Sequence, residues 1–372
     1  FQFAVLKKLP IIYLVQDNQW GISANAQESR AMNACEYAKG FKGLHTIEID
    51  GSDFIESYRN IKTVFDQVRT QREPFLVQAN VPLLGHHTSG VRKEFYRTEE
   101  DLNKHATQDP FPKLEQALYK IGISEKQLQH IQNTATQQVQ QDFEKACAAP
   151  EPNIKDVQKH VFIPTSITEE KGKRSPTENE KVVMVDAALF AIEEILQQNP
   201  DAILYGQDVG RRLGGVFREA ATLAQKFGDD RVFNTAIQEA YIIGSTVGLS
   251  AMGMKPIIEI QFGDYIYPGF NQLVTEISKS CYLSNGKFNV QTLIRIPVGA
   301  YGGGGPYHSG SIESTLLSIK GIKIVYPSNA ADMNGLMKAA FYDPNPVIML
   351  EHKGLYWSKV PGTEEAKTIL PS

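Results

Sequence analysis

The stretch TIEIDGSDFIESYRNIKTVFDQVRTQREPFLVQA, Thr46–Ala79, decides the fold class of this chain. Its first five and last five residues are short runs rich in β-branched or apolar side chains, which are typical of strands. Between them, apolar residues recur at helical spacing behind Asp53, a residue type that caps helices. The apolar set is Phe54, Tyr58, Ile61, Phe65 and Val68. Strand, helix and strand in this order predict a parallel sheet with helices on its faces.

The same alternation extends in both directions along the chain. LPIIYLV, Leu9–Val15, predicts a buried strand, and helical stretches follow Ala79 as far as a Gln-rich segment that ends near Ala148. After residue 180 the alternation restarts. Strands are expected at 202–206, 256–260, 292–298, 323–327 and 346–350, and helices at 182–199, 217–227, 238–254, 268–283 and behind Ser328.

A charged connection separates the two halves. Residues 149–180 carry proline and charge without hydrophobic periodicity, which is typical of a linker. The sequence therefore predicts an α/β protein of two doubly wound domains with parallel sheets flanked by helices, residues 1–148 and 181–372. Ligand sites in such sheets lie at the carboxyl ends of the strands.

Composition narrows the class of protein. The chain has 372 residues, 42% of them apolar, and a formal net charge of -4. The absence of excess positive charge argues against a nucleic-acid or anionic-membrane partner. No apolar run reaches the roughly 20 residues of a membrane-spanning helix. Three widely separated cysteines have no metal or disulfide spacing, which is typical of a reducing compartment such as the cytoplasm.

In the first half, polar residues follow two predicted strands. Asp17 and Asn18, in QDNQWGIS, are compatible with a simple turn. They are equally compatible with an oxygen-ligand site for a hard cation, with the Asn18 side chain and a backbone carbonyl two residues later as ligands. Farther along, GHHTS, Gly85–Ser89, places two histidines in a polar loop. Acid–base work suits this pair better than metal binding, and an inert exposed pair is the alternative.

In the second half, Glu239 stands at the start of an almost entirely apolar helix. A carboxylate there can simply complement the helix dipole. Its apolar neighbours would also desolvate it, which keeps a proton on the carboxyl near neutrality and makes Glu239 a candidate proton handler. EIQFGDYIYPGF, Glu259–Phe270, intersperses Gln261 and Tyr265 among apolar residues. This pattern suits an aromatic core edge or a site for a flat heterocycle.

The stretch GGGGPYHSG, Gly302–Gly310, places His308 after four glycines. A dinucleotide phosphate loop requires an acidic residue about twenty positions on, and none is present. We therefore expect the glycines to allow a tight turn at a strand end, with His308 as the functional residue.

Taken together, these strings resemble the decarboxylating first component of 2-oxo acid dehydrogenase complexes, a thiamine diphosphate-dependent family. The resemblance is to a fused α–β form of the branched-chain (2-oxoisovalerate) type. LPIIYLVQDNQWGIS, GHHTS and FYRTEEDL are similar to the C-terminal part of the diphosphate-binding α portion. YGQDVGRRLGGVFR, EIQFGDYIYPGFNQ and PYHSGSIES are similar to the pyrimidine-binding first domain of the β portion. The resemblance implies the central fragment of a longer chain.

The resemblance also implies a role for each matching residue. Asn18 and the Trp20 carbonyl would bind Mg²⁺, whose acidic ligand would precede Phe1, so we expect the fragment alone to bind the cofactor poorly and to be inactive. Gln16 would lie at the diphosphate. Glu239 would hydrogen-bond the aminopyrimidine ring, and His87 and His308 would flank the reactive carbon of thiamine diphosphate and deliver protons. Further contacts to the pyrimidine ring would come from Ile237, Gln261 and Tyr265.

The implied reaction is oxidative decarboxylation of a branched-chain 2-oxo acid with acyl transfer to the lipoyl group of an acyltransferase partner. A homodimer is also implied. Two positions depart from the family pattern, since Gln16 replaces an arginine and Gln207 replaces a glutamate. Thr88 stands where some relatives carry a regulatory serine, so phosphorylation at this position is an open question. The alternatives are a pyruvate or acetoin-type member, a folded fragment without cofactor, a transketolase-like carbohydrate enzyme and, more distantly, a Rossmann dehydrogenase.

Overall fold

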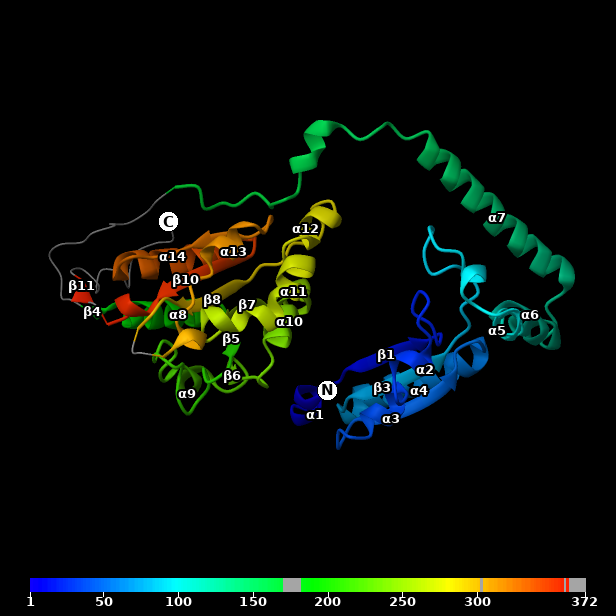
Figure 1. The fold of residues 1–372 in the computed structure, drawn as a ribbon, viewed down its shortest axis with the longest axis horizontal. Coiled ribbons are helices and arrows are strands. Elements are labelled where there is room, and N and C mark those ends of the chain that lie inside the picture. The colour runs from blue at the N-terminus through cyan, green and yellow to red at the C-terminus, as the bar shows by residue number, and fades with distance from the viewer. Residues whose placement is uncertain (170–181, 302–303, 358, 361–372) are drawn as a thin grey trace. The chain divides into compact units, whose positions relative to one another are not determined.

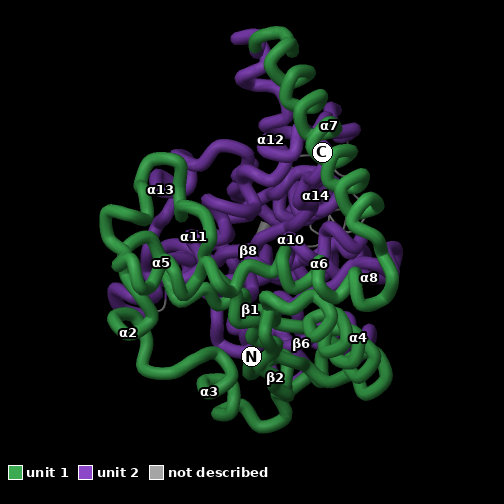
Figure 2. The backbone as a smooth tube through the Cα atoms, turned by 90° about the vertical axis from the view of Figure 1, so that its right-hand side faces the viewer, with its two compact units in different colours: residues 1–151 green, residues 152–372 purple. Residues whose placement is uncertain are grey.

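The computed structural model describes residues 1–169, 182–301, 304–357 and 359–360. The chain divides into two compact units, which we call unit 1 (Phe1–Glu151) and unit 2 (Pro152–Ser372) (Figure 2). Of the predicted linker, residues 149–169 are described and 170–180 lie outside the described residues. No helix within the described ranges is long and apolar enough to cross a membrane.

Unit 1 contains a three-stranded parallel sheet with helices around it (Figure 1). The strand order is β1 (Ile12–Asp17), β3 (Phe75–Asn80) and β2 (His45–Asp50). The central strand β3 is buried along almost its whole length. The helices are α1 (Gln2–Leu6), α2 (Ala26–Ser29), α3 (Ala34–Ala38), α4 (Phe54–Gln71), α5 (Glu99–Ala106), α6 (Pro110–Lys120) and α7 (Glu125–Cys147).

The deciding stretch forms β2, α4 and β3, as predicted. The carboxylate of Asp53 accepts hydrogen bonds from two backbone N–H groups and caps α4. The buried face of α4 differs in part from the prediction, because Val64 and Val68 are buried while Phe54 and Tyr58 are 58% and 62% exposed. The spacing of Phe54 and Tyr58 is helical, but these side chains lie off the stripe that faces the sheet.

Unit 2 contains a six-stranded parallel sheet covered by helices on both faces (Figure 1). The strand order is β6 (Val232–Asn234), β5 (Ala202–Gly206), β7 (Lys255–Glu259), β8 (Leu293–Val298), β10 (Val347–His352) and β9 (Lys323–Val325). Two short strands, β4 (Val182–Val183) and β11 (Lys359–Val360), form a separate antiparallel pair. The helices are α8 (Met184–Gln198), α9 (Leu223–Phe227), α10 (Glu239–Ala251), α11 (Phe270–Gln272), α12 (Ser280–Leu283), α13 (Glu313–Leu317) and α14 (Ala330–Tyr342).

Alternating side chains of the unit 2 strands build two separate cores. One core combines Leu204, Ile257 and Met349 of the sheet with apolar residues of α8 and α14. The other combines Ile258, Ile294 and further strand residues with α10 and the segment after β7. Because both faces are buried, the strands are nearly continuous apolar runs, as expected for a doubly wound parallel sheet. The predicted fold class is confirmed.

Three predicted helices of unit 2 have different limits in the structure. Only Leu223–Phe227 of the expected 217–227 helix forms, because Arg218 and Thr222 have φ values of 72° and 67°, which lie outside the right-handed helical region. The expected 268–283 helix is divided into α11, a π-helical segment (Leu273–Ile277) and α12. The cap of α14 is Asn329 rather than Ser328, and its side chain accepts a hydrogen bond from the Asp332 N–H.

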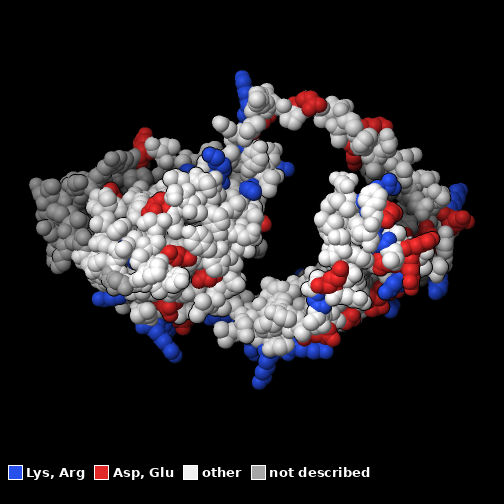
Figure 3. Space-filling model, viewed as in Figure 1, with Lys and Arg blue, Asp and Glu red and all other residues white. Residues whose placement is uncertain are grey.

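Acidic and basic side chains are interspersed on the face of the molecule seen in Figure 3. This distribution accords with the small net charge of -4.

The two neighbouring candidates for the α14 cap allow a direct test. Asn329→Ala is expected to lower the free energy of unfolding by about 1 kcal/mol, because it removes the acceptor of the Asp332 N–H. Ser328→Ala is the matched control, since Ser328 is exposed, and should change stability by less than about 0.5 kcal/mol. Denaturant unfolding of both variants measures the difference. Equal losses in both variants would contradict the assignment of the cap.

Candidate functional site

The carboxyl ends of the unit 2 strands place the predicted polar residues at one edge of the sheet. Gln207 and Asp208 follow β5, and Glu239 follows β6 by five residues. Gln261 follows β7, and the segment that carries His308 follows β8. In a parallel sheet these loops emerge on the same side, which is where ligands bind in doubly wound folds.

Glu239 begins α10 and pairs with Gln207. Gln238 caps the helix by accepting a hydrogen bond from the Ala240 N–H, which leaves the Glu239 carboxylate on the first turn. Its Oε1 accepts a hydrogen bond from Gln207 Nε2 at 3.2 Å. Glu239 is half-buried rather than enclosed, because Ile237 is 85% exposed and does not cover it. An amide, rather than a second carboxylate, thus faces Glu239.

Gln261 is oriented by Asp208, which follows the neighbouring strand β5. Its side chain is almost fully buried, and its Nε2 donates a hydrogen bond to Asp208 Oδ2 at 2.6 Å. The loops after β5 and β7 are therefore joined directly above the sheet. This contact aligns an amide whose oxygen can accept a hydrogen bond from a ligand.

His308 is held at both ring nitrogens. Its Nδ1 lies 2.9 Å from the Gly304 carbonyl oxygen, and its Nε2 lies 2.8 Å from the Tyr265 hydroxyl. A carbonyl can only accept, so Nδ1 carries the proton and Nε2 of the neutral ring accepts from Tyr265. The Phe262 ring packs edge-on against the imidazole with centroids 4.7 Å apart. The structure thus brings Tyr265 and His308 together, as two residues predicted for one site.

The glycine-rich segment is described from Gly304 onward, and Gly302 and Gly303 lie outside the described residues. A Cβ on Gly304 would lie 2.8 Å from His308 Cβ, and a Cβ on Gly310 would lie 2.4 Å from an Asp264 carboxylate oxygen. A side chain at either position would displace these groups. The two glycines therefore allow the close packing around His308.

In unit 1, Asn18 and Trp20 lie where β1 ends. The Asn18 side-chain oxygen accepts the Trp20 N–H at 2.9 Å, a local turn in which Gln19 has a φ of 66°. Arg97 stacks over the Trp20 ring at 5.4 Å. Gln16 and His87 are exposed, in β1 and in the loop after β3. The two readings of Asn18, turn and cation ligand, are both compatible with this geometry.

A cavity of about 430 Å³ lies at the carboxyl ends of the unit 1 strands, bordered by Asp17, Asp50, Asn80, His105 and Lys113 among others. Asp17 is paired with Arg30 at 2.6 Å. Burial alone would raise the pKa of Asp50, but hydrogen bonds from Lys113 and Ser52 outweigh it and lower that pKa. Burial lowers the pKa of His105. The sequence did not single out His105 or Lys113.

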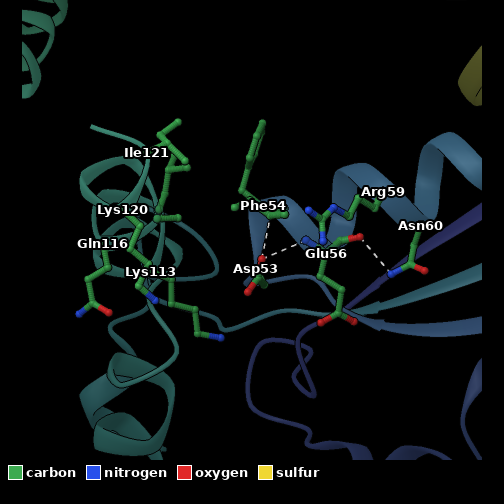
Figure 4. A pocket seen from close by; sticks show the side chains of 12 residues that line it. Asp53, Phe54, Glu56, Arg59, Asn60, Lys113, Gln116, Lys120 and Ile121 are labelled. Carbon is green, nitrogen blue, oxygen red and sulfur yellow. Dashed lines mark hydrogen bonds between the residues drawn. The ribbon is translucent and has the colours of Figure 1, made fainter. Parts of the chain in front are cut away.

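A larger cavity of unit 1, about 840 Å³, lies between the start of α4 and the helix α6. Figure 4 shows Asp53 and Glu56 on one side and Lys113 and Lys120 on the other. None of the predicted site residues borders it. Because Asp53 is already engaged as the cap of α4, we assign no ligand to this cavity.

The polar and aromatic groups at the strand ends of unit 2 fit a flat aminopyrimidine ring. A half-buried carboxylate, an aligned amide and an aromatic edge converge at one sheet edge, which is what such a ring requires for orientation. Unit 1 offers the Asn18 amide oxygen and the Trp20 carbonyl, which fit part of the oxygen shell of a hard cation such as Mg²⁺. Within the described ranges, no group of three or more His, Cys, Asp or Glu side chains could hold a metal ion.

The most buried charges of unit 2 were missed by the sequence analysis. Arg295 of β8 binds Glu351 of β10 through two hydrogen bonds of 2.7 and 2.8 Å and Glu259 of β7 at 3.0 Å. Tyr356 donates to Glu351 at 2.7 Å. All four side chains are at most 1% exposed. The signal was present in the sequence, since Glu259, Arg295 and Glu351 each interrupt an apolar strand.

The environment of Glu259 favours its protonated form. Burial raises the pKa of Glu259 well above its usual value, and the neighbouring Glu219 carboxylate raises it further. Glu219 is itself fully buried and accepts the Phe217 N–H at 2.9 Å. The guanidinium of Arg295 opposes the shift without cancelling it. Glu259 therefore holds its proton to higher pH than an ordinary carboxyl does.

Family models match both halves of the chain. Residues 1–155 match the model described as dehydrogenase E1 component, and residues 180–358 match the model described as transketolase, pyrimidine binding domain. The resemblance to dehydrogenase E1 components and to the pyrimidine-binding domain is thereby confirmed. That the chain is a fused form and a central fragment stays a prediction.

Curated relatives match about half of the chain. The 2-oxoisovalerate dehydrogenase subunit beta 2 of Arabidopsis thaliana is 44% identical over 182 residues, 49% of this chain and 50% of that protein. The 2-oxoisovalerate dehydrogenase subunit beta of Pseudomonas aeruginosa is 39% identical and covers 49% and 56%. The pyruvate dehydrogenase E1 component subunit beta of Acholeplasma laidlawii is 40% identical and covers 47% and 53%. The chain thus spans about half the length of these relatives.

A solved structure described as a split-gene transketolase, inactive beta4 tetramer, is 21% identical, with a TM-score of 0.36 over 47% of this chain and 52% of that chain. A similarity of this size adds nothing to the fold described above.

The raised pKa of Glu259 predicts a pH dependence of stability. The folded state keeps a proton on Glu259 at pH values where the unfolded chain has lost it, so the free energy of unfolding should fall as the pH rises above about 4.3. Glu259→Gln mimics the protonated carboxyl and should weaken this decline, with stability at pH 8 equal to or above that of the wild type. Denaturant unfolding between pH 5 and 9 measures both.

Glu351→Gln provides the contrast. It weakens the doubly bonded carboxylate that compensates the buried guanidinium, and it should cost about 3–5 kcal/mol at pH 7. A Glu259→Gln variant that is as unstable at pH 7 as Glu351→Gln would contradict the raised pKa of Glu259.

Proposed function

We propose that this chain is part of a thiamine diphosphate-dependent 2-oxo acid dehydrogenase of the branched-chain (2-oxoisovalerate) type. The observation that carries the proposal is the strand-end group of unit 2, in which Glu239 pairs with Gln207 and Tyr265 pairs with His308. The two family matches support the proposal. The names of two relatives, both 2-oxoisovalerate dehydrogenase subunits, support the branched-chain assignment.

The residues of unit 2 would orient the cofactor ring. Glu239 would hold a proton toward the aminopyrimidine, with Gln207 aligning its carboxylate. Gln261 and Tyr265 would bind the same ring, and exposed Ile237 would pack against it. For unit 1 we propose Asn18 and the Trp20 carbonyl as ligands of Mg²⁺, and Gln16 as a contact to a diphosphate. When bound, thiamine diphosphate would accept the electron pair that stays behind when carbon dioxide leaves.

Proton movements at the substrate would fall to the two histidines. His308 presents the lone pair of Nε2 toward the Tyr265 hydroxyl, so Nε2 can take a proton and afterwards return it while Nδ1–H stays bound to Gly304. His87, on an exposed loop, would assist transfer of the acyl group to a lipoyl arm. The partner is then the lipoyl-bearing acyltransferase of the complex, and we propose a homodimer in the cytoplasm as the working form.

A pyruvate-type activity is the second candidate, because the Acholeplasma laidlawii relative is named a pyruvate dehydrogenase subunit at 40% identity. The residues described at the strand ends orient a cofactor rather than a substrate side chain. Substrate preference therefore has to be measured on the full-length protein.

Substitution of Glu239 tests the assignment. In the full-length protein, Glu239→Gln should lower the rate of 2-oxoisovalerate decarboxylation, followed with an artificial electron acceptor, by at least about 100-fold. The exposed Glu276→Gln in the same unit is the control and should retain the wild-type rate. Pyruvate assayed in parallel decides between the two substrate classes. Turnover by Glu239→Gln at the wild-type rate would refute the role of this carboxylate.

Cofactor binding separates an enzyme from a folded scaffold. Titration calorimetry of the full-length protein with thiamine diphosphate should show saturable binding that depends on Mg²⁺ and weakens in Asn18→Ala, because the amide oxygen is lost from the cation shell. Lys62→Ala, on the surface of α4, is the control. Absence of binding to the wild-type protein would favour the scaffold.

A further inference from the structure

A buried lysine lies directly behind His308. Lys353 follows β10, is only 2% exposed and donates a hydrogen bond from its ammonium group to the His308 carbonyl oxygen. The ammonium also lies over the Phe262 ring, 4.9 Å from its centroid. The same ring packs against the His308 imidazole. Lys353 therefore contacts both the backbone and the ring environment of His308 from a different strand.

Asp264 holds the same segment from the other side. Its Oδ2 accepts the Gly310 N–H at 2.8 Å, two residues beyond the carbonyl that Lys353 binds. The peptide groups between His308 and Gly310 are thus fixed by an ammonium and a carboxylate. Burial lowers the pKa of Lys353, and the Asp264 carboxylate opposes this change. The two charges act together on one short stretch of backbone.

The position of this backbone determines which ring nitrogen of His308 carries the proton. The Nδ1 proton of His308 is bound by the carbonyl of Gly304, which belongs to the same turn. A shift of the His308 peptide would move the ring away from Gly304 and Tyr265 together. The hydrogen bond from Nδ1 to the Gly304 carbonyl therefore depends on Lys353, which lies outside the turn.

Packing alone does not account for a lysine at this place. Taking an ammonium out of water costs free energy unless its donors are satisfied, and a methionine would fill a similar volume without that cost. The bonds that Lys353 makes are directed at the His308 segment.

We propose that Lys353 is a positioning residue, whose ammonium fixes the His308 peptide and so keeps His308 in the Nδ1–H tautomer with Nε2 directed at Tyr265. The statement about the tautomer stands on the geometry of unit 2. Its consequence for catalysis rests on the proposed function.

The tautomer can be read directly by nuclear magnetic resonance. In the full-length protein labelled with ¹⁵N-histidine, the His308 signals, assigned by their loss in His308→Gln, should show protonated Nδ1 and unprotonated Nε2 above pH 8. Lys353→Met should convert them to an averaged signal of both tautomers. Lys338→Met is the matched control, because Lys338 is also buried, at 3%, and pairs with Glu194 in the same unit. Wild-type His308 signals in Lys353→Met would overturn the proposal.

A measurement on the unaltered protein covers the case in which Lys353→Met does not fold. A crystal structure of the full-length protein should place Lys353 Nζ within about 3.2 Å of the His308 carbonyl oxygen. An ammonium directed elsewhere would overturn the proposal.

The kinetic readout tests the catalytic consequence separately. With 2-oxoisovalerate, Lys353→Met should lower kcat about tenfold and change KM less than about twofold, since positioning of a proton-transfer group acts on the reacting state. An unchanged kcat together with a lost tautomer would overturn the catalytic consequence. If the wild-type protein decarboxylates neither 2-oxo acid, the proposed function fails, and the resonance experiment still decides the role of Lys353.

Discussion

The candidate site of unit 2 depends on the guanidinium of Arg295, which fixes the strands that end at this site. It binds Glu259 and Glu351, so that one cation joins the three central strands β7, β8 and β10 near their carboxyl ends. Two carboxylates around one cation, with Glu219 as a third, would leave uncompensated negative charge in the interior. The raised pKa of Glu259 favours its neutral form, which reduces this excess, and the group can then stay buried.

The loops that form the candidate site begin where this ion network ends. Gln261 lies two residues after Glu259, and Lys353 lies two residues after Glu351. The segment that carries His308 follows β8, the strand of Arg295. Strand ends that cannot shift relative to one another give these loops fixed starting points, and the hydrogen bonds of Tyr265 and Lys353 then complete the alignment of His308.

Local sequence patterns predicted which segments form helices and strands, but they predicted the first and last residues of these segments less accurately. Apolar runs located the strands because buried parallel strands have few other sequence solutions. The α14 cap was placed on Ser328, although Asn329 makes the bond, since both residue types cap helices and only the backbone geometry distinguishes them. The burial of Glu239 was also overestimated. Ile237, next but one to Glu239 in the sequence, is 85% exposed and does not cover the carboxylate.

The sequence by itself determined the α/β class, the break between the two halves and the residue types at the strand ends. These follow from periodicity and from residue chemistry, which act over a few positions. Only the tertiary structure decided which polar groups meet, such as Gln207 with Glu239 and Lys353 with the His308 carbonyl. Such pairs are separated by tens of residues, and their contact depends on the order and register of the strands, which no local pattern contains.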